Sequence, residues 1–520
     1  MPNLKAAGIR TAYPKSTAEM GLKSWLAKPL ARSVRRSISA WAADGAGAQE
    51  NQFRYLVHNL ARTAFGKAHG IRPNISRDEF RKQIPIADYE SLRPWIERII
   101  AGERDVLWPG RPKYFAKTSG TTSGVKFIPI TSASMPHHIA GARNALLCYI
   151  AETGKADFLD GKLIFLSGSP VMRKEGDIFT GRLSGIVNHH IPAYLRRSQM
   201  PSYETNCIED WEVKVNRIAD ETLDQRMTLI SGIPPWVQMY FDKVLEKKGA
   251  ATVKEVFPDF NLFVYGGVNF EPYRKKLFDT IGERIDSIET YPASEGFIAF
   301  QDRQSDPSLL MLLNSGIYYE FVPVSEYHQP NPPRYSIDEV ELGVNYAVIM
   351  HTNAGLWGYS IGDTVRFMSK NPYKILVTGR IKHFISAFGE HVIGEEVERA
   401  MAAVCGQFGV STAEYTVAPV VAPASGLPYH EWLVEFDRRP DDMPAFSAAL
   451  DNAMQEQNIY YRDLISGSVL QSLQVREMPQ GAFIAYMRSI GKLGGQNKVP
   501  RLSNDRELAG KLLEANGLKD

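Results

Sequence analysis

The chain has 520 residues, 44% of them hydrophobic and 23% charged, a composition that is ordinary for a globular protein of two or more domains. Its formal net charge of +2 creates no field that would attract nucleic acid, so we expect a small-molecule substrate. The three cysteines have neither metal-ligand nor disulfide spacing, and no apolar run approaches the roughly 20 residues of a membrane-spanning helix, so we expect a cytoplasmic protein without a transmembrane segment.

The N-terminal segment is locally basic. Lysines and arginines recur from Lys5 to Arg36, with almost no acidic residue among them. Apolar residues from Leu22 to Trp41 recur at helical spacing, which predicts a helix that is interrupted at Pro29. Two interpretations stay open: a basic helix packed on the first domain, or a membrane-surface helix or transit peptide.

The middle of the chain alternates short apolar runs with longer amphipathic segments. Residues 50–106 are typical of a helical lead-in. Beyond it we expect strands near 162–166, 227–230 and 262–265, and helices near 205–220, 236–247 and 273–281. This βα rhythm indicates a sheet covered by helices, and a predominantly β region follows from 309 to 367.

A second alternation of strands and helices starts after Gly379. Strands are expected at 381–386, 415–421 and 431–436, and helices at 395–404 and 443–456. We therefore predict an α/β fold with two domains. A large N-terminal domain, residues 1–380, combines βα sheets with a β-rich subdomain, and a smaller, mobile α+β C-terminal domain spans residues 381–520.

Residues 118–126 form a segment rich in hydroxyl groups and glycine that ends in a lysine. Backbone N–H groups and Ser and Thr hydroxyls of such a loop can surround a polyphosphate, while Lys126 neutralises charge. The Gly-Lys-Ser/Thr of nucleoside-triphosphatase P-loops is absent, and an ordinary turn is the alternative. The candidate phosphate-binding residues are Ser119, Gly120, Thr121 and Thr122.

Residues 289–296, Glu-Thr-Tyr-Pro-Ala-Ser-Glu-Gly, bring an aromatic ring, a hydroxyl and a carboxylate together in a stretch that we expect to be irregular. Tyr291 could stack on adenine and Ser294 could bond the α-phosphate. Glu295 could hold Mg²⁺, which prefers one or two carboxylates plus phosphate oxygens. A solvated loop is the alternative.

Two further segments offer ligand contacts. Gly266 and Gly267 end an expected strand, as is needed where a ligand approaches the backbone, although turn chemistry explains them equally well. Asp363 follows a glycine at a strand start, where its carboxylate can accept hydrogen bonds from both ribose hydroxyls. A hairpin turn is the rival interpretation.

Together these segments resemble the adenylate-forming superfamily of acyl-CoA synthetases, peptide-synthetase adenylation domains and luciferases. They are more closely similar to its acyl acid amido synthetases, the auxin-responsive plant family and its bacterial relatives, over roughly residues 50–505. Residues 61–69, Ala-Arg-Thr-Ala-Phe-Gly-Lys-Ala-His, and 84–89, Ile-Pro-Ile-Ala-Asp-Tyr, are typical of that branch.

The resemblance implies further roles. Arg380 is expected near the ribose and phosphates, and Lys382 at the hinge between the domains. Lys498 is expected to be the mobile catalytic lysine that bridges the acyl carboxylate and the α-phosphate. The phosphate loop departs from the superfamily in having Val125 where many members carry a proline before the lysine.

The predicted function is therefore ligation that uses ATP and Mg²⁺. A carboxylic acid would become an acyl adenylate with release of pyrophosphate, and the acyl group would pass to an amino acid or another amine. Because two anions must meet, positioning and charge neutralisation, rather than a protein nucleophile, would drive the first step. We expect the acid between residues 165–240 and the segment Tyr265–Phe270. A coenzyme A ligase and a nucleotide-binding module without turnover are the alternatives.

Overall fold

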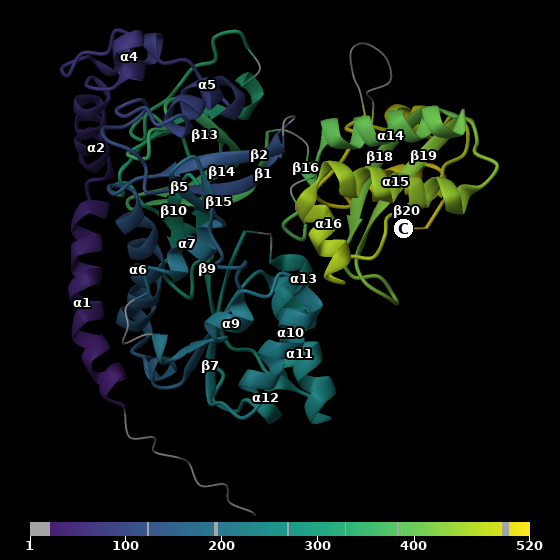
Figure 1. The fold of residues 1–520 in the computed structure, drawn as a ribbon, viewed down its shortest axis with the longest axis horizontal. Helices are drawn as coiled ribbons and strands as arrows, with labels where there is room; N and C mark the ends of the chain where they lie inside the picture. The colour runs from purple at the N-terminus through teal and green to yellow at the C-terminus, as the bar shows by residue number, and fades with distance from the viewer. Residues whose placement is uncertain are drawn as a thin grey trace, which may run out of the picture.

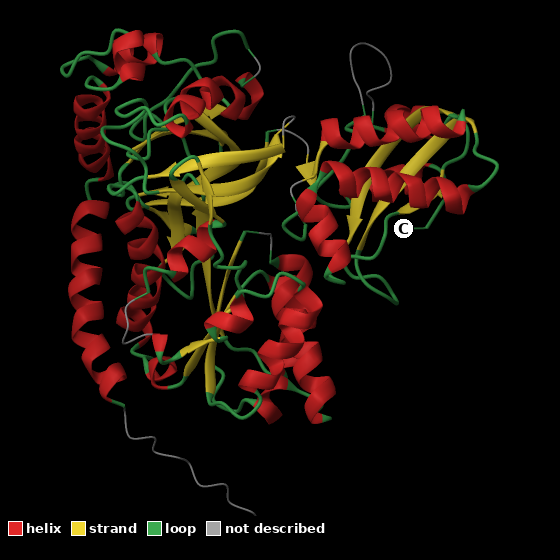
Figure 2. Ribbon diagram, viewed as in Figure 1, coloured by secondary structure: helices red, strands yellow, loops and turns green. Residues whose placement is uncertain are grey.

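The computed structural model describes residues 21–121, 124–191, 196–267, 270–327, 329–381, 384–385, 387–390, 392–490 and 499–519. In Figure 1 a large N-terminal part, coloured from purple to green, lies beside a smaller C-terminal part in light green and yellow. Helices cover sheets in both parts (Figure 2). No helix among these residues is both long and apolar enough to cross a bilayer.

Five helices lead into the N-terminal part, and four of them start at a capping side chain. Asp44, Thr63, Ser76 and Asp88 each accept a backbone N–H from the first turn of the helix that follows. The predicted helical lead-in is confirmed. The helices are α1 (Leu22–Ala42), α2 (Gly45–Leu60), α3 (Ala64–Ala68), α4 (Arg77–Gln83) and α5 (Tyr89–Ile100).

Helix α1 continues through Pro29, so the expected interruption was wrong. Proline lacks the N–H that would bond the carbonyl of Trp25. Both residues lie on the exposed side of the helix, where water can satisfy that carbonyl. The other side of α1 packs against α6 (Met135–Thr153), with Ala27, Ala31 and Ile38 buried between them and the sheet.

An 11-stranded sheet runs through the N-terminal part in the order β12-β13-β14-β15-β11-β10-β9-β8-β7-β3-β6. From β6 to β9 neighbouring strands are parallel, and from β9 to β12 they are antiparallel. The parallel strands are β3 (Lys162–Phe165), β6 (Gln199–Met200), β7 (Met227–Ser231), β8 (Leu262–Gly266) and β9 (Asp286–Ala293). The antiparallel strands are β10 (Gly296–Gln301), β11 (Leu309–Met311), β12 (Ile317–Pro323), β13 (Asn345–Thr352), β14 (Tyr359–Lys370) and β15 (Tyr373–Arg380).

Helices of the predicted βα rhythm cover the parallel half of the sheet (Figure 2). They share one apolar core with β3, β7 and β8. The order of strands and helices agrees with the expectation from the sequence, and so does the β-rich region that follows. These helices are α10 (Trp211–Thr222), α11 (Pro234–Lys248), α12 (Val253–Val256) and α13 (Glu271–Ile281). Two shorter helices, α7 (Leu183–Asn188) and α9 (Tyr203–Asn206), contribute no residue to this core.

The antiparallel half of the sheet is strongly curled. Asp363 on β14 and Tyr291 on β9 are four strands apart in the sheet order, which would separate them by roughly 19 Å in a flat sheet with about 4.8 Å between strands. The Tyr291 hydroxyl nevertheless donates a hydrogen bond to the Asp363 carboxylate. The strands curl around a core to which Tyr291, Val348 and Val365 all contribute.

A buried carboxylate fastens the lead-in to this antiparallel half. Glu320 on β12 accepts hydrogen bonds from Arg81 of α4 at 2.9 Å, from Arg334 at 2.8 Å and from Nε2 of His351 at 2.9 Å. Burial alone would raise the pKa of Glu320, but these donors lower it to about 2. Because Nδ1 of His351 accepts the Gly358 N–H, the ring proton lies on Nε2 and faces the carboxylate.

A second, four-stranded sheet carries the predicted phosphate loop. Strands β1 (Tyr114–Thr121) and β2 (Gly124–Ile130) form an antiparallel hairpin, and β5 (Ile178–Gly181) lies parallel to β1 on its other side, next to β4 (Arg173–Glu175). The sequence pattern gave no sign of this pairing between β1 and β5, which are far apart along the chain.

The C-terminal part has its own sheet, β18-β19-β20, and its own apolar core. The expected helices at 395–404 and 443–456 and the strands near 415–421 and 431–436 are confirmed. Of the expected strand at 381–386 the structure describes Ile381, Phe384 and Ile385, and the last two form β16. Its elements are β16 (Phe384–Ile385), β17 (Val392–Ile393), α14 (Gly394–Phe408), β18 (Ser411–Val420), β19 (Tyr429–Arg438), α15 (Met443–Gln457), α16 (Ile459–Ser466), β20 (Gln474–Glu477), α17 (Ala482–Ser489) and α18 (Glu507–Ala515). Strand β15 ends at Arg380, and the domain boundary near that residue remains a prediction.

Candidate active site

Residues from three of the predicted segments meet where β9 faces β14. The Tyr291 hydroxyl lies 2.5 Å from Oδ2 of Asp363, and both side chains are buried. Asp363 stands opposite Arg380 in the β14–β15 register, so the backbone of the predicted Gly379-Arg380 pair lies on the neighbouring strand. The adenine and ribose residues named from the sequence are thus direct neighbours, although 72 residues separate them in the chain.

Ser294 and Glu295 form the two-residue turn between β9 and β10, with Ala293 paired to Gly296 across it. The stretch expected to be irregular is therefore a strand followed by a tight hairpin turn. Both turn residues line the same cavity as Tyr291 and Asp363. Because the turn follows the carboxyl end of a parallel strand, it occupies the edge where ligands of open α/β sheets bind.

Glycine is favoured at positions 266 and 267 for two different structural reasons. A Cβ on Gly266 would lie 2.3 Å from the carbonyl oxygen of Thr290, so this glycine permits β8 to approach β9 closely. Gly267 has a φ of +84°, in the left-handed region that favours glycine, and no heavy atom lies within 4 Å of where its Cβ would be. Gly267 lines the cavity, so its backbone faces the open space of the site.

The predicted phosphate segment falls on the β1–β2 hairpin, with residues 118–121 on β1 and 124–126 on β2. The backbone of Ser119, Gly120 and Thr121 belongs to β1, and Lys117 and Thr118 of the same strand line the cavity. Lys126 on β2 also lines it, with its Nζ 5.9 Å from the centre of the Tyr89 ring. The hairpin therefore brings its predicted lysine to the cavity that holds Tyr291 and Asp363.

Some predicted site residues fall outside the described part of the chain. Thr122, Lys382 and Lys498 are not described, and neither are the side chains of the residues from 119 to 121 and of Arg380. Their roles remain predictions from the sequence.

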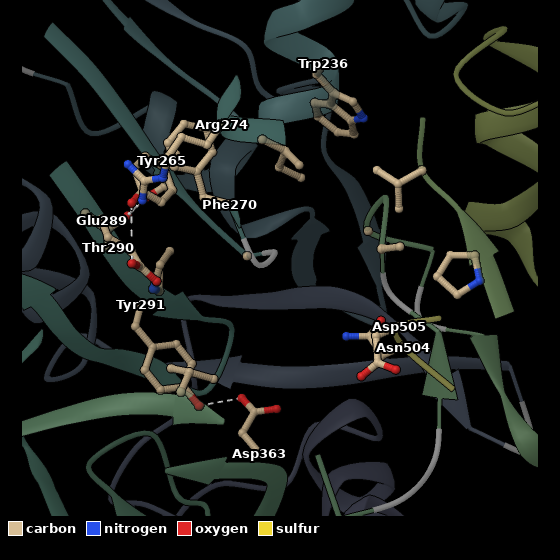
Figure 3. Close-up of a pocket in the computed structure, with 18 of the residues that line it drawn as sticks. Trp236, Tyr265, Phe270, Arg274, Glu289, Thr290, Tyr291, Asp363, Asn504 and Asp505 are labelled. Carbon is tan, nitrogen blue, oxygen red and sulfur yellow. Dashed lines mark hydrogen bonds between the residues drawn. The ribbon is translucent and has the colours of Figure 1, made fainter. Parts of the chain in front are cut away.

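The cavity itself has a volume of about 2030 Å³ and lies between the large sheet and the C-terminal part. Ligand pockets usually measure about 300 to 1,000 Å³, so this one has room for a nucleotide together with a second substrate. Figure 3 shows Tyr265, Tyr291 and Asp363 on one side of it and Asn504 and Asp505 of the C-terminal part on the other.

An aromatic wall borders the cavity away from Asp363. The rings of Tyr265 and Phe270 lie 4.4 Å apart, and the guanidinium of Arg274 lies 4.7 Å from the Phe270 ring. Ile233 and Trp236 line the same cavity, and the acyl pocket expected between residues 165–240 and the segment Tyr265–Phe270 remains a prediction. Sequence reasoning missed Arg274, because a single arginine in an amphipathic helix carries no signal that separates it from a surface residue.

The C-terminal part contacts the N-terminal part next to β5, the strand that pairs with β1. Arg182, directly after β5, forms a 2.9 Å ion pair with Asp463 of α16, and its guanidinium lies 4.9 Å from the ring of Tyr460. Burial raises the pKa of Asp463, although Arg182 opposes this rise. Sequence reasoning also missed Arg182, since only the pairing of β5 with β1 brings it to the site.

Comparison with known proteins identifies the family. Models of the N-terminal, central and C-terminal domains of the GH3 family match residues 34–202, 310–380 and 395–507. The chain belongs to the GH3 family. The family resemblance stated from the sequence is therefore confirmed, and the α/β fold with a large and a small part is the fold of this GH3 protein.

The relatives of this GH3 chain are amino acid conjugating enzymes, as the sequence predicted. It is 22% identical to the jasmonoyl-L-amino acid synthetase JAR4 of Nicotiana attenuata over 62% of its own length and 67% of the relative's. It is 21% identical to the indole-3-acetic acid-amido synthetase GH3.3 of Arabidopsis thaliana over 87% of its own length and 88% of the relative's.

Solved structures give the same fold. The acyl acid amido synthetase AtGH3.15 in complex with 2,4-DB superposes with a TM-score of 0.60 over 93% of this chain and 96% of that one, at 14% identity. A 2-hydroxyisobutyryl-CoA ligase in its thioesterification state superposes with a TM-score of 0.54 over 91% and 92% of the two chains, also at 14% identity.

Proposed function

We propose that this chain is a ligase that joins a carboxylic acid to an amino acid or another amine through an acyl adenylate. Membership of an adenylate-forming family implies that it uses ATP. The observation that carries the proposal is the meeting of Tyr291, Asp363 and the Ser294-Glu295 turn in one cavity that also borders the β1–β2 hairpin. These groups come from distant segments and supply the contacts that a nucleotide needs.

In the first half-reaction a carboxylate oxygen of the acid attacks the α-phosphorus of ATP, and the bond from that phosphorus to the pyrophosphate oxygen breaks. Tyr291 would hold the adenine and Asp363 would accept hydrogen bonds from the ribose hydroxyls. Lys126 and the hairpin would hold the phosphates, while Lys498 would neutralise the charge between acid and α-phosphate. The chain would then act by positioning the two substrates and by supplying positive charge near the phosphates, without a covalent intermediate on the protein.

Glu295 would hold Mg²⁺ in this scheme. The described residues contain no group of three or more His, Cys, Asp or Glu side chains that could hold a metal by themselves. One carboxylate, that of Glu295 at the cavity wall, suffices for an ion that takes most of its ligands from phosphate oxygens and water. When bound, the ion would supply neutralisation of phosphate charge.

In the second half-reaction the amine nitrogen attacks the acyl carbon, the bond to the AMP oxygen breaks, and the proton of the amine passes to water. Lys498 must leave for the amine to enter, which a rotation of the C-terminal part about Lys382 would achieve. The Arg182–Asp463 pair is one contact that such a rotation would break.

The test is pyrophosphate release from ATP and Mg²⁺ over a panel of aryl, indole and fatty acids with amino acids, followed by mass spectrometry. An amide product supports the proposal. A thioester with coenzyme A, and no amide, would replace it with the coenzyme A ligase, and ATP binding without turnover across the panel would favour the binding module.

Lys498→Ala tests the catalytic lysine. We expect it to slow adenylate formation far more than aminolysis of supplied adenylate, whereas Lys511→Ala, which removes an exposed lysine of α18, should change neither step. Equal losses in both half-reactions would contradict the role given to Lys498.

A further inference from the structure

The first nine residues of helix α1 are amphipathic in an unusual sense, because the small residues there are buried and the large apolar residues face outward. Ser24, Ala27 and Ala31 pack inward against the domain. Four large apolar side chains in the first nine residues are exposed: Leu22 by 72%, Trp25 by 59%, Leu26 by 53% and Leu30 by 52%. A helix that only covered the domain would place its large apolar side chains inside.

The exposed apolar side chains form one stripe. Positions 22, 25, 26 and 30 are spaced by three, one and four residues, which puts them on one face of a helix. α1 lies along the outer edge of the N-terminal part, on the side opposite the C-terminal part (Figure 1). The stripe therefore faces away from the active-site cavity.

The helix is held firmly at the end that carries the stripe. Asp160 accepts hydrogen bonds from the backbone N–H groups of Gly21 and Ser24, which occupy the start of the helix. The Ser24 hydroxyl also donates to the carbonyl of Ala156 at 2.7 Å. These bonds fix the direction of α1, so the stripe is presented on a rigid support.

Every charged residue of α1 is basic. Its sequence contains Lys23, Lys28, Arg32, Arg35 and Arg36 and no acidic residue, although the whole chain has a formal net charge of only +2. Arg35 is neutralised by Asp302 at 2.8 Å. Lys28, Arg32 and Arg36 follow one another at four-residue intervals, so they form a cationic row along one side of the stripe.

We propose that the outer face of α1 binds the surface of an anionic lipid bilayer. The apolar stripe would enter the boundary between headgroups and acyl chains, where tryptophan is favoured. The cationic row would contact anionic headgroups, and its sign makes the two surfaces complementary. This inference concerns a surface remote from the cavity and does not depend on the proposed ligase activity.

The test is co-sedimentation of the full chain with vesicles of phosphatidylcholine alone or of phosphatidylcholine with phosphatidylglycerol. We expect binding to the anionic vesicles that falls as salt is raised, and weak binding to the neutral ones. Replacing Lys28, Arg32 and Arg36 by serine should weaken binding on the order of a hundredfold. Replacing Trp25, Leu26 and Leu30 by serine should weaken it about tenfold or more.

A matched control replaces three apolar residues that are each 55% exposed elsewhere, through Val213→Ser, Leu342→Ser and Ile484→Ser. It should bind vesicles like the unchanged chain. Absence of binding to anionic vesicles would overturn the proposal, and so would an equal loss in the control. A dimer in light scattering that the Trp25, Leu26 and Leu30 substitutions convert to a monomer, without vesicle binding, would assign the face to a second copy instead.

Discussion

Replacing Glu320 by glutamine should destabilise the protein in a way that depends on pH. The pKa of Glu320 falls from an ordinary value of 4.5 to about 2 in the folded chain, because Arg81, Arg334 and His351 donate to its buried carboxylate. Each unit of difference between folded and unfolded pKa is worth about 1.4 kcal/mol. The ionised carboxylate therefore contributes about 3 kcal/mol to the free energy of unfolding at neutral pH.

The direction in which stability changes with pH follows from the lowered pKa of Glu320. The contribution is complete above the unfolded pKa of 4.5 and is lost as the pH falls from there to about 2. Relative to Glu320→Gln, the unchanged chain should be more stable by about 3 kcal/mol at pH 7 and by about 2 kcal/mol at pH 3.5. Urea unfolding followed by tryptophan fluorescence measures this difference, since Trp357 is fully buried with its ring 6.4 Å from that of His351.

Glu339→Gln is the matched control. Glu339 also pairs with Arg81, at 3.0 Å, but its side chain is 45% exposed, so we expect a loss of no more than about 1 kcal/mol. The reasoning would be refuted if Glu320→Gln were as stable as the unchanged chain at pH 7. A difference that stayed constant between pH 7 and pH 3.5 would refute the assigned pKa.

Three further outcomes are expected. Tyr291→Phe keeps the ring but removes the hydroxyl that donates to Asp363, so the KM for ATP should rise about tenfold while the KM for the acid changes little; equal rises in steady-state assays would contradict the nucleotide assignment. Arg182→Ala removes a partly exposed ion pair to Asp463 worth about 1 kcal/mol, so limited proteolysis of the chain should speed up severalfold; an unchanged cleavage rate would show that the pair does not hold the C-terminal part. Gly266→Ala places a Cβ 2.3 Å from the Thr290 carbonyl oxygen and should lower the free energy of unfolding by about 1 to 3 kcal/mol in urea titrations, whereas Gly406→Ala, with open space around it, should not; equal stabilities would contradict the close approach of β8 and β9.

The sequence predicted the elements that local patterning controls. Apolar runs followed by amphipathic helices located β7, α11 and β8, and the same pattern located α14, β19 and α15 in the C-terminal part. Tyr291, Ser294, Glu295 and Asp363 were also found from local chemistry, because short polar segments with an aromatic ring or a carboxylate stand out between apolar strands. These residues line one cavity in the structure.

The sequence could not predict contacts that depend on pairing between distant strands. Arg182 reaches the site only because β5 lies beside β1, and no pattern in either strand specifies that partner. The continuity of α1 through Pro29 likewise depends on which side of the helix faces water. The spacing of apolar residues shows which residues share one face of a helix. It does not show whether that face packs against another element or stays exposed to water.

The position of β9 explains why the residues proposed to bind the nucleotide converge here. It is the last parallel strand and the first antiparallel one, so its carboxyl end lies at the ligand-binding edge while its turn starts the curled half of the sheet. The curl then brings Asp363 back to Tyr291. Because the same curl encloses a core of side chains such as Val348 and Val365, substitutions that loosen this core should weaken nucleotide binding without direct contact. In the proposed reaction, by contrast, the acceptor amine would enter a cavity that the C-terminal part also borders, so its recognition would depend on the contact between the two parts and not on the curl.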